Sequence, residues 1–197
     1  TLSNAPDVTS VAVQNSSSAG TIAGIAAGAA LAVTDQAVGA TFTYSDTSGL
    51  ADSASLTLNN VTGSAAISVA GVETLSIASS GQANAVAVSG AAVETLNVSG
   101  SKSLDLSTSS ITPTKIDASG ATAGLNFTPV AGSATTQIGG SGADTIVGTS
   151  GNDVLTGNAG NDRITSGGGN DNINAGAGND TITMAATLTS ADTIVGG

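Results

Sequence analysis

Aspartate residues recur at a fixed spacing along residues 139–183, and their carboxylates are the groups of this sequence best placed for chemistry. Five consecutive nine-residue units read GGSGADTIV, GTSGNDVLT, GNAGNDRIT, SGGGNDNIN and AGAGNDTIT. The fourth residue of every unit is glycine, the sixth is aspartate and the eighth is aliphatic. The aspartates are Asp144, Asp153, Asp162, Asp171 and Asp180. A fixed period with one chemical role at each phase predicts a solenoid.

Each unit has the composition of a tight turn followed by a short strand. The glycines permit positive φ and close backbone approach, and the last three residues place one aliphatic side chain inward between two outward ones. Two units then make one coil of eighteen residues, with two parallel sheets joined by turns. Residues eighteen apart therefore stack. This predicts one column of Asp144, Asp162 and Asp180 and an opposite column of Asp153 and Asp171.

Stacked carboxylates about 4.8 Å apart, the spacing of neighbouring strands, repel one another. The repulsion is roughly 1 kcal/mol per pair in bulk water and about 3–4 kcal/mol at an effective dielectric constant near 20. Arg163 is the only cation within the repeats. Calcium suits such columns because it takes six to eight oxygen ligands from carboxylates and backbone carbonyls. The columns therefore predict Ca²⁺ as the ligand.

The units match the pattern G-G-x-G-x-D-x-U-x, and the segment resembles the RTX calcium-binding β-roll family. In that family each ion lies between successive turns of one side, held by two such aspartates and by turn carbonyls. The resemblance implies sites between Asp144 and Asp162, between Asp162 and Asp180, and between Asp153 and Asp171. The alternative is a flexible Gly/Asn/Asp-rich linker, which five in-register repeats disfavour.

Two features depart from the family pattern. The fourth and fifth units begin with Ser166 and Ala175 in place of glycine, and Asp192 in ADTIVGG comes three residues late, so its column is left open. On the resemblance, the metal ligands are six carboxylates and the turn residues at the first and third positions of each unit. They are Asp144, Asp153, Asp162, Asp171, Asp180 and Asp192, with Gly139, Ser141, Gly148, Ser150, Gly157, Ala159, Ser166, Gly168, Ala175 and Ala177.

The rest of the chain alternates in the same way but with few aspartates. From residue 51, inward–outward–inward triplets recur, and GVETLSI (71–77) matches AVETLNV (92–98) at a distance of twenty-one residues. We expect a calcium-poor β-solenoid over 51–138 that continues into a β-roll over 139–197. Residues 1–50 carry three alternating segments, Ser10–Gln14, Ala30–Thr34 and Ala40–Tyr44, which either begin the solenoid, cap it, or form a separate small β-sandwich. The predicted fold is all-β: an elongated, right-handed parallel β-solenoid.

A narrower resemblance comes from the VETL repeats in a Ser/Thr/Ala/Gly-rich solenoid, from KIDASG (115–120), and from the RTX units that follow. Together they resemble the RTX-type S-layer proteins of Gram-negative bacteria. The resemblance implies type I secretion, an extracellular cell-surface location and self-association into a surface lattice. Contact with a cell-surface polysaccharide would fall to other parts of the parent protein. We expect a longer parent because the sequence lacks an initial Met and ends on Gly196–Gly197, the opening of a further unit.

Composition limits the other function classes. The 197 residues include no Cys and no His, carry a formal net charge of −11, and contain three Lys or Arg residues. Such a chain is not expected to bind nucleic acid through phosphates, and no apolar run is long enough to cross a membrane. Without His, Cys or a catalytic motif, we expect no enzyme activity and no catalytic or cofactor residues. Two functions remain: a calcium-binding structural segment of an S-layer protein, or the stalk or secretion and folding module of an RTX adhesin, toxin or hydrolase.

Overall fold

The structure is a computed structural model that describes eight stretches of the chain: 10–14, 20–25, 28–35, 40–44, 52–62, 65–129, 132–184 and 188–197. Within these stretches the chain forms nineteen strands and no helix. Accordingly, this part of the protein offers no helix that is long and apolar enough to span a bilayer. Local sequence explains the strands, because aliphatic residues alternate with Ser, Thr and Ala, and Gly-rich turns separate the strands.

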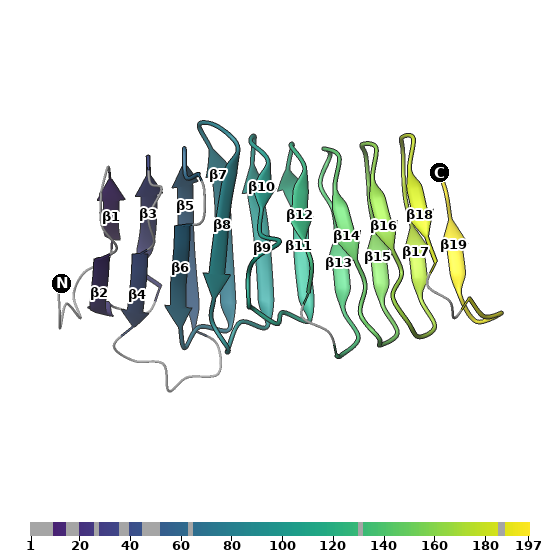
Figure 1. The fold of residues 1–197 in the computed structure, drawn as a ribbon, viewed down its shortest axis with the longest axis horizontal. Helices are drawn as coiled ribbons and strands as arrows, with labels where there is room; N and C mark the ends of the chain where they lie inside the picture. The colour runs from purple at the N-terminus through teal and green to yellow at the C-terminus, as the bar shows by residue number, and fades with distance from the viewer. Residues whose placement is uncertain are drawn as a thin grey trace.

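The strands build two parallel sheets that face each other along the rod in Figure 1. The ten-stranded sheet contains β1 (Ser10–Gln14), β3 (Ala30–Thr34), β5 (Ser53–Asn59), β7 (Thr74–Ser80), β9 (Thr95–Gly100), β11 (Lys115–Ala121), β13 (Thr136–Ile138), β15 (Val154–Thr156), β17 (Asn172–Asn174) and β19 (Thr193–Val195). The nine-stranded sheet contains β2 (Gly20–Ile25), β4 (Ala40–Tyr44), β6 (Ala65–Ala70), β8 (Asn84–Ser89), β10 (Leu104–Asp105), β12 (Leu125–Phe127), β14 (Thr145–Val147), β16 (Arg163–Thr165) and β18 (Thr181–Thr183).

Consecutive strands alternate between the two sheets, so each strand pairs with the strand two places along the chain. In the repeats Ile146 pairs with Ile164, eighteen residues later. In the preceding solenoid Thr74 pairs with Thr95, twenty-one residues later. The predicted parallel β-solenoid with two strands per coil is therefore confirmed.

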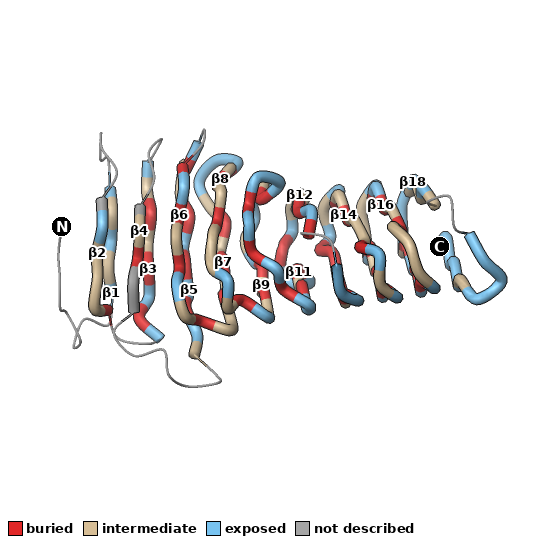
Figure 2. The backbone as a smooth tube through the Cα atoms, turned by 60° about the horizontal axis from the view of Figure 1, so that its bottom comes forward, coloured by how far each residue is buried: buried red, intermediate tan, exposed pale blue. Residues whose placement is uncertain are grey.

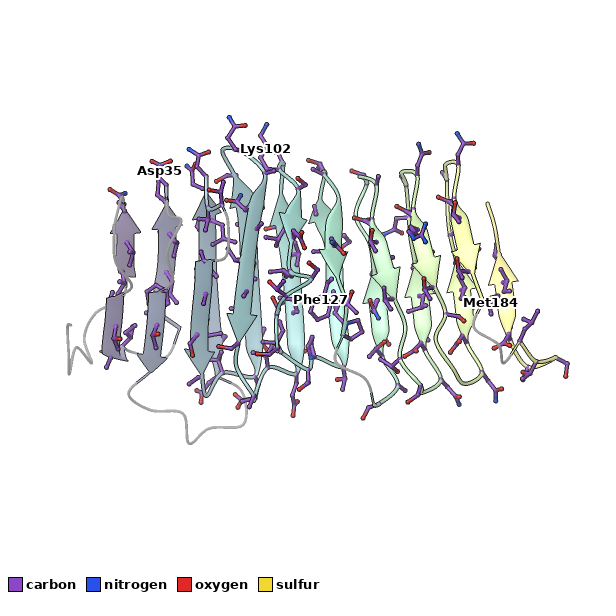
Figure 3. The ribbon with its side chains drawn as sticks, viewed as in Figure 1. Asp35, Lys102, Phe127 and Met184 are labelled. Carbon is purple, nitrogen blue, oxygen red and sulfur yellow. The ribbon has the colours of Figure 1, made fainter. Side chains whose placement is uncertain are left out.

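In strands such as β5 and β7 alternate side chains are buried between the sheets, and the buried residues in Figure 2 follow this alternation. They form two apolar clusters. One extends from Ile25 to Phe127; the other contains Ile146, Leu155, Ile164, Ile173 and Ala175. Phe127, at the end of the first cluster, is 1% exposed and is labelled in Figure 3. The boundary between the two clusters lies between β12 and β14.

The strands expected near the N-terminus lie at their predicted bounds, as β1, β3 and β4. They belong to the same two sheets as the rest of the rod, since β1 pairs with β3 and β3 with β5. Residues 45–49 (SDTSG), whose Ser, Asp and Gly content predicts a turn, lie outside the described residues. Two strands, β2 and β13, were not predicted. In β13 the inward position is Gln137, so the apolar signal is missing.

Candidate metal centre

The aspartates of the repeats stack in the two predicted columns, linked by hydrogen bonds from backbone to side chain. In the first column the Asp144 amide donates to Asp162 Oδ1 (2.8 Å), and the Asp162 amide donates to Asp180 Oδ1 (2.9 Å). Each carboxylate thus reaches back to the coil before it. The link fixes each side chain at the turn, directly before its strand.

The second column is built in the same way, and it has one member that the sequence did not assign to either column. The Asp153 amide donates to Asp171 Oδ1 (3.0 Å), and the Asp171 amide donates to Asp192 Oδ1 (2.7 Å). Asp192 joins the column because β19 pairs with β17 with Thr193 opposite Asn172, a register of twenty-one residues in place of eighteen. Asp192 therefore lies in the column of Asp153 and Asp171.

All of these carboxylates are buried except Asp180 and Asp192, which end the two columns. Asp144, Asp153, Asp162 and Asp171 are each at most 3% exposed, whereas Asp180 is partly exposed. A buried carboxylate needs hydrogen bonds or a cation to compensate for lost hydration. Burial of these charges is therefore the main electrostatic feature of the site.

The supply of hydrogen bonds differs between the first and later carboxylates. Asp144 accepts from the Leu125 amide at Oδ1 and from the Gly140 amide at Oδ2, both at 2.7 Å. Asp162 accepts one hydrogen bond, at Oδ1, and its Oδ2 is buried without a hydrogen-bond partner among the described residues. An orphaned anionic oxygen inside a column is what a cation would ligate.

Glycine at the first position of a unit lets a carboxylate and a carbonyl oxygen approach its Cα more closely than a Cβ would allow, and the point where the two oxygens converge is called the glycine space below. A Cβ placed on Gly139 would lie 2.5 Å from both Asp144 Oδ2 and the Gly157 carbonyl oxygen of the next coil. Corresponding spaces beside Gly148 and Gly157 are each lined by a carboxylate and a carbonyl oxygen. Carboxylate and carbonyl oxygens that converge on one small space form a donor set suited to Ca²⁺. The residues present therefore fit the ion.

These three spaces correspond to the three proposed aspartate pairs. The two later units carry a Cβ at this position, in Ser166 and Ala175. Their backbone amides, like those of the first three units, donate to the carbonyl oxygen that ends the paired strand of the next coil. The spaces are thus confined to the first three units, and a site between Asp171 and Asp192 would have to accommodate Ser166.

The amides of the third-position residues donate in the opposite direction, to carbonyl oxygens of the preceding coil. The Gly168 amide donates to the Thr149 carbonyl (2.7 Å), and the Ala177 amide to the Asn158 carbonyl (2.6 Å). Ala159 and Ser141 donate likewise to the preceding coil. Metal ligation by the carbonyl groups of the first- and third-position residues stays a prediction of the family resemblance.

Burial raises the pKa of the Asp144, Asp162 and Asp171 carboxyls, against the hydrogen bonds from backbone amides, which lower it. Neighbouring carboxylates add to the rise: Asp144 and Asp180 at Asp162, and Asp153 and Asp192 at Asp171. The ion-free columns thus disfavour their own charge. A bound divalent cation would relieve both causes.

Sequence reasoning missed the two threonines that hold the first carboxylate of the second column. Thr135 donates from its amide (2.6 Å) and its hydroxyl (2.8 Å) to Asp153 Oδ1. Thr149 donates from its amide to Asp153 Oδ2 (2.7 Å). The available signal was spacing, because Thr135 precedes Asp153 by the eighteen residues of one coil.

Residues 138–173 and 165–183 match the family described as RTX calcium-binding nonapeptide repeat (4 copies). Among curated proteins and among solved structures, none matches the chain significantly. RTX calcium-binding repeats are therefore present, on the segment that forms the two aspartate columns. The matched residues do not extend into the solenoid that carries the VETL repeats.

Proposed function

We propose that this chain is a structural segment of a secreted cell-surface protein of the S-layer type, in which calcium binding completes the fold of the roll. The observation that carries the proposal is the column of buried carboxylates with the orphaned Asp162 Oδ2 at its centre. The family match on residues 138–183 supports calcium as the ligand. Repeats of this kind are typical of secreted proteins, which supports an extracellular location.

The columns make the fold of the roll conditional on the ion. Where calcium is scarce, as in cytosol, buried carboxylates repel one another and the roll is held back from folding, a state fit for export. Outside the cell, a ligand that binds only the folded state stabilises it by RT ln(1 + [L]/Kd) per site. Calcium supplies positive charge to the columns, and the carboxylates and turn carbonyls hold it.

The solenoid supports a structural role because its outer face is regular. On the ten-stranded sheet, the outward residues of β5 are exposed Ser53, Ser55 and Thr57, and β7 lies in register beside them. Short uncharged side chains at strand spacing offer the same contact on β5 and on β7. We propose that such faces make the repeated lateral contacts of a surface lattice, with no catalysis assigned to the chain and any polysaccharide contact made elsewhere in the parent protein.

A second candidate rests on the continuity of the rod. Strand pairing is unbroken from β1 to β19 in one sheet and from β2 to β18 in the other. A continuous rod also suits the stalk of an RTX adhesin, or the folding module of a secreted toxin or hydrolase. In both cases the rod would stay monomeric.

A calcium titration of the 197-residue chain, followed by far-UV circular dichroism and by sedimentation, tests both proposals. We expect β-structure to grow cooperatively with calcium and ordered assemblies to form. A matched control is Asp117→Asn, which removes one carboxylate from the outer face of β11 and should titrate like the unaltered chain. Growth of β-structure without assembly would favour the stalk or folding module, and no response to calcium would overturn the calcium-dependent fold.

A further inference from the structure

A polar side chain interrupts the interior where the solenoid meets the roll. Gln137 lies at the inward position of β13, with Ile116 of β11 and Leu155 of β15 as its register partners. It is 3% exposed, and the two apolar clusters end on either side of it. A buried amide is unfavourable unless its groups are hydrogen-bonded. The contacts of Gln137 therefore indicate why it is there.

The Gln137 side chain begins a directed chain of hydrogen bonds that ends on a carboxylate of the second column. Its Nε2 donates to the Val147 carbonyl (2.7 Å) and to Thr135 Oγ1 (3.1 Å). An amide nitrogen only donates and an ionised carboxylate only accepts. The single hydroxyl proton of Thr135 is therefore directed to Asp153 Oδ1, 2.8 Å away.

The second oxygen of the same carboxylate is held from its own turn. The Thr149 amide donates to Asp153 Oδ2 (2.7 Å). The Thr149 hydroxyl lies 2.8 Å from the Ser133 carbonyl, to which it donates, and accepts from the Gly151 amide (3.1 Å). Both oxygens of Asp153 are thus satisfied by the protein, with Thr135, Thr149 and Asp153 each at most 6% exposed.

This arrangement is particular to the start of the second column. The first carboxylate of the opposite column, Asp144, is held by two backbone amides and by no side chain of the described residues. Further along, one oxygen of Asp162 has no hydrogen-bond partner within the part of the chain that the structure describes. Charge-assisted hydrogen bonds from Thr135 therefore compensate the buried charge of Asp153. The later carboxylates need a cation for the same compensation.

We propose that Thr135, oriented by Gln137, is a positioning residue for calcium binding: it fixes the Asp153 carboxylate and keeps the first coil of the roll, β14 and β15, folded when calcium is absent. The calcium sites of the second column then start from an ordered coil attached to the solenoid. This inference rests on the proposed calcium-dependent fold. It adds the side chains that make the boundary between the two regions independent of calcium.

Hydrogen exchange of the whole chain, read by mass spectrometry in chelator and in calcium, tests the proposal. In chelator we expect residues 145–156 to be protected and residues 163–183 to exchange freely. Thr135→Val keeps the shape and removes the hydroxyl. It should lower protection of 145–156 in chelator by about tenfold or more, the factor for losing a hydrogen bond to a charged group.

Two variants separate positioning from simple destabilisation. Thr135→Ser retains the hydroxyl and should restore protection. Thr136→Val makes the same exchange on the outward side of β13 and should leave protection unchanged. In saturating calcium all variants should reach the same protection, with the midpoint of Thr135→Val raised about threefold or more.

The outcomes distinguish this inference from the proposed function. If 145–156 exchanges as fast as 163–183 in chelator while both become protected in calcium, the role of Thr135 is overturned and the calcium-dependent fold stands. If Thr135→Val behaves like Thr136→Val, the role of Thr135 is likewise overturned. If calcium changes protection nowhere, the proposed function itself fails.

Discussion

The solenoid over β5–β12 and the roll over β14–β18 share one coil geometry but fill the interior differently. A solenoid strand such as β5 buries Ala54, Leu56 and Leu58, whereas a roll strand such as β16 buries Ile164 alone. Complete burial of one aliphatic side chain stabilises by about 1.5–3 kcal/mol. A roll coil therefore lacks most of the apolar stabilisation that a solenoid coil has, and must obtain the rest elsewhere.

The position before each strand shows where the difference arises. In the ten-stranded sheet Glu73 and Glu94 precede β7 and β9, and the Glu94 amide donates to the Glu73 carbonyl (2.8 Å). In the roll the same place holds Asp153 and Asp171, which are buried where Glu94 is exposed. An acidic residue here is an outer-surface group when the strand interior is apolar and long. It becomes part of the interior when the strand is three residues long.

The largest expected effect comes from truncating the apolar interior. Leu96 of β9 and Ile164 of β16 are both 0% exposed. Replacing either by Ala should lower the free energy of unfolding of its own region by about 2–5 kcal/mol. We expect Leu96→Ala to act equally in chelator and in calcium, and Ile164→Ala to act only in calcium. Urea unfolding in both buffers measures this, and equal behaviour of the two variants would remove the distinction between the regions.

The next effect tests how the columns share their ions. Asp162 lies between two aspartates and Asp153 precedes one, so Asp162→Ala should weaken calcium binding more. If each lost ligand weakens one site about tenfold, or about 1.4 kcal/mol, the product of the binding constants falls roughly 100-fold and roughly tenfold, respectively. Isothermal titration calorimetry gives both values.

Asp171→Ala extends this test to Asp192, whose column the sequence left open. Asp171 Oδ1 accepts a hydrogen bond from the Asp153 amide, and the Asp171 amide donates to Asp192 Oδ1. If the pair with Asp192 binds an ion, Asp171→Ala should resemble Asp162→Ala. If Ser166 prevents that site, the variant should resemble Asp153→Ala. Equal losses for Asp162→Ala and Asp153→Ala would contradict the two-column geometry.

Period and residue type were enough to predict the solenoid, the columns and the eighteen-residue register, because each phase of the repeat has one physical role. The remainder depended on contacts that periodicity does not encode. β13 was missed because Gln137 replaces an aliphatic residue and is compensated by Thr135 and Val147. The column of Asp192 was undetermined because its place depends on the register of β19 against β17, which spacing alone does not give.

A smaller effect is expected from filling a glycine space in the roll. In Gly157→Ala the new Cβ would clash with Asp162 Oδ2 and the Ala175 carbonyl oxygen, so that these oxygens must move apart. The variant should weaken calcium binding severalfold, because the Cβ occupies the space between two ligand oxygens. Gly196→Ala is the matched control, since Gly196 follows β19 as Gly157 follows β15 and a Cβ there meets nothing within 4 Å. Similar affinities for the two variants would show that the space is not used.

The smallest effect is that of pH on the stability of the roll. Its sign should differ between chelator and calcium. Burial and neighbouring carboxylates raise the pKa of Asp162 above the ordinary value of 3.8. The folded roll then binds more protons than the unfolded chain, so in chelator its stability increases as pH falls from 7 toward 3.8. Asp117 on β11 has a lowered pKa and contributes in the opposite direction, within the solenoid.

Region-resolved hydrogen exchange in chelator therefore measures the roll separately. We expect protection of 163–183 to rise on acidification, and to rise less in Asp162→Asn, which no longer titrates there. In calcium the direction should reverse, because protons compete with the ion for the same carboxylates. Protection that falls on acidification in chelator would mean that the columns are stabilised by their charge, and the comparison between an apolar solenoid and an ion-dependent roll would fail at its electrostatic premise.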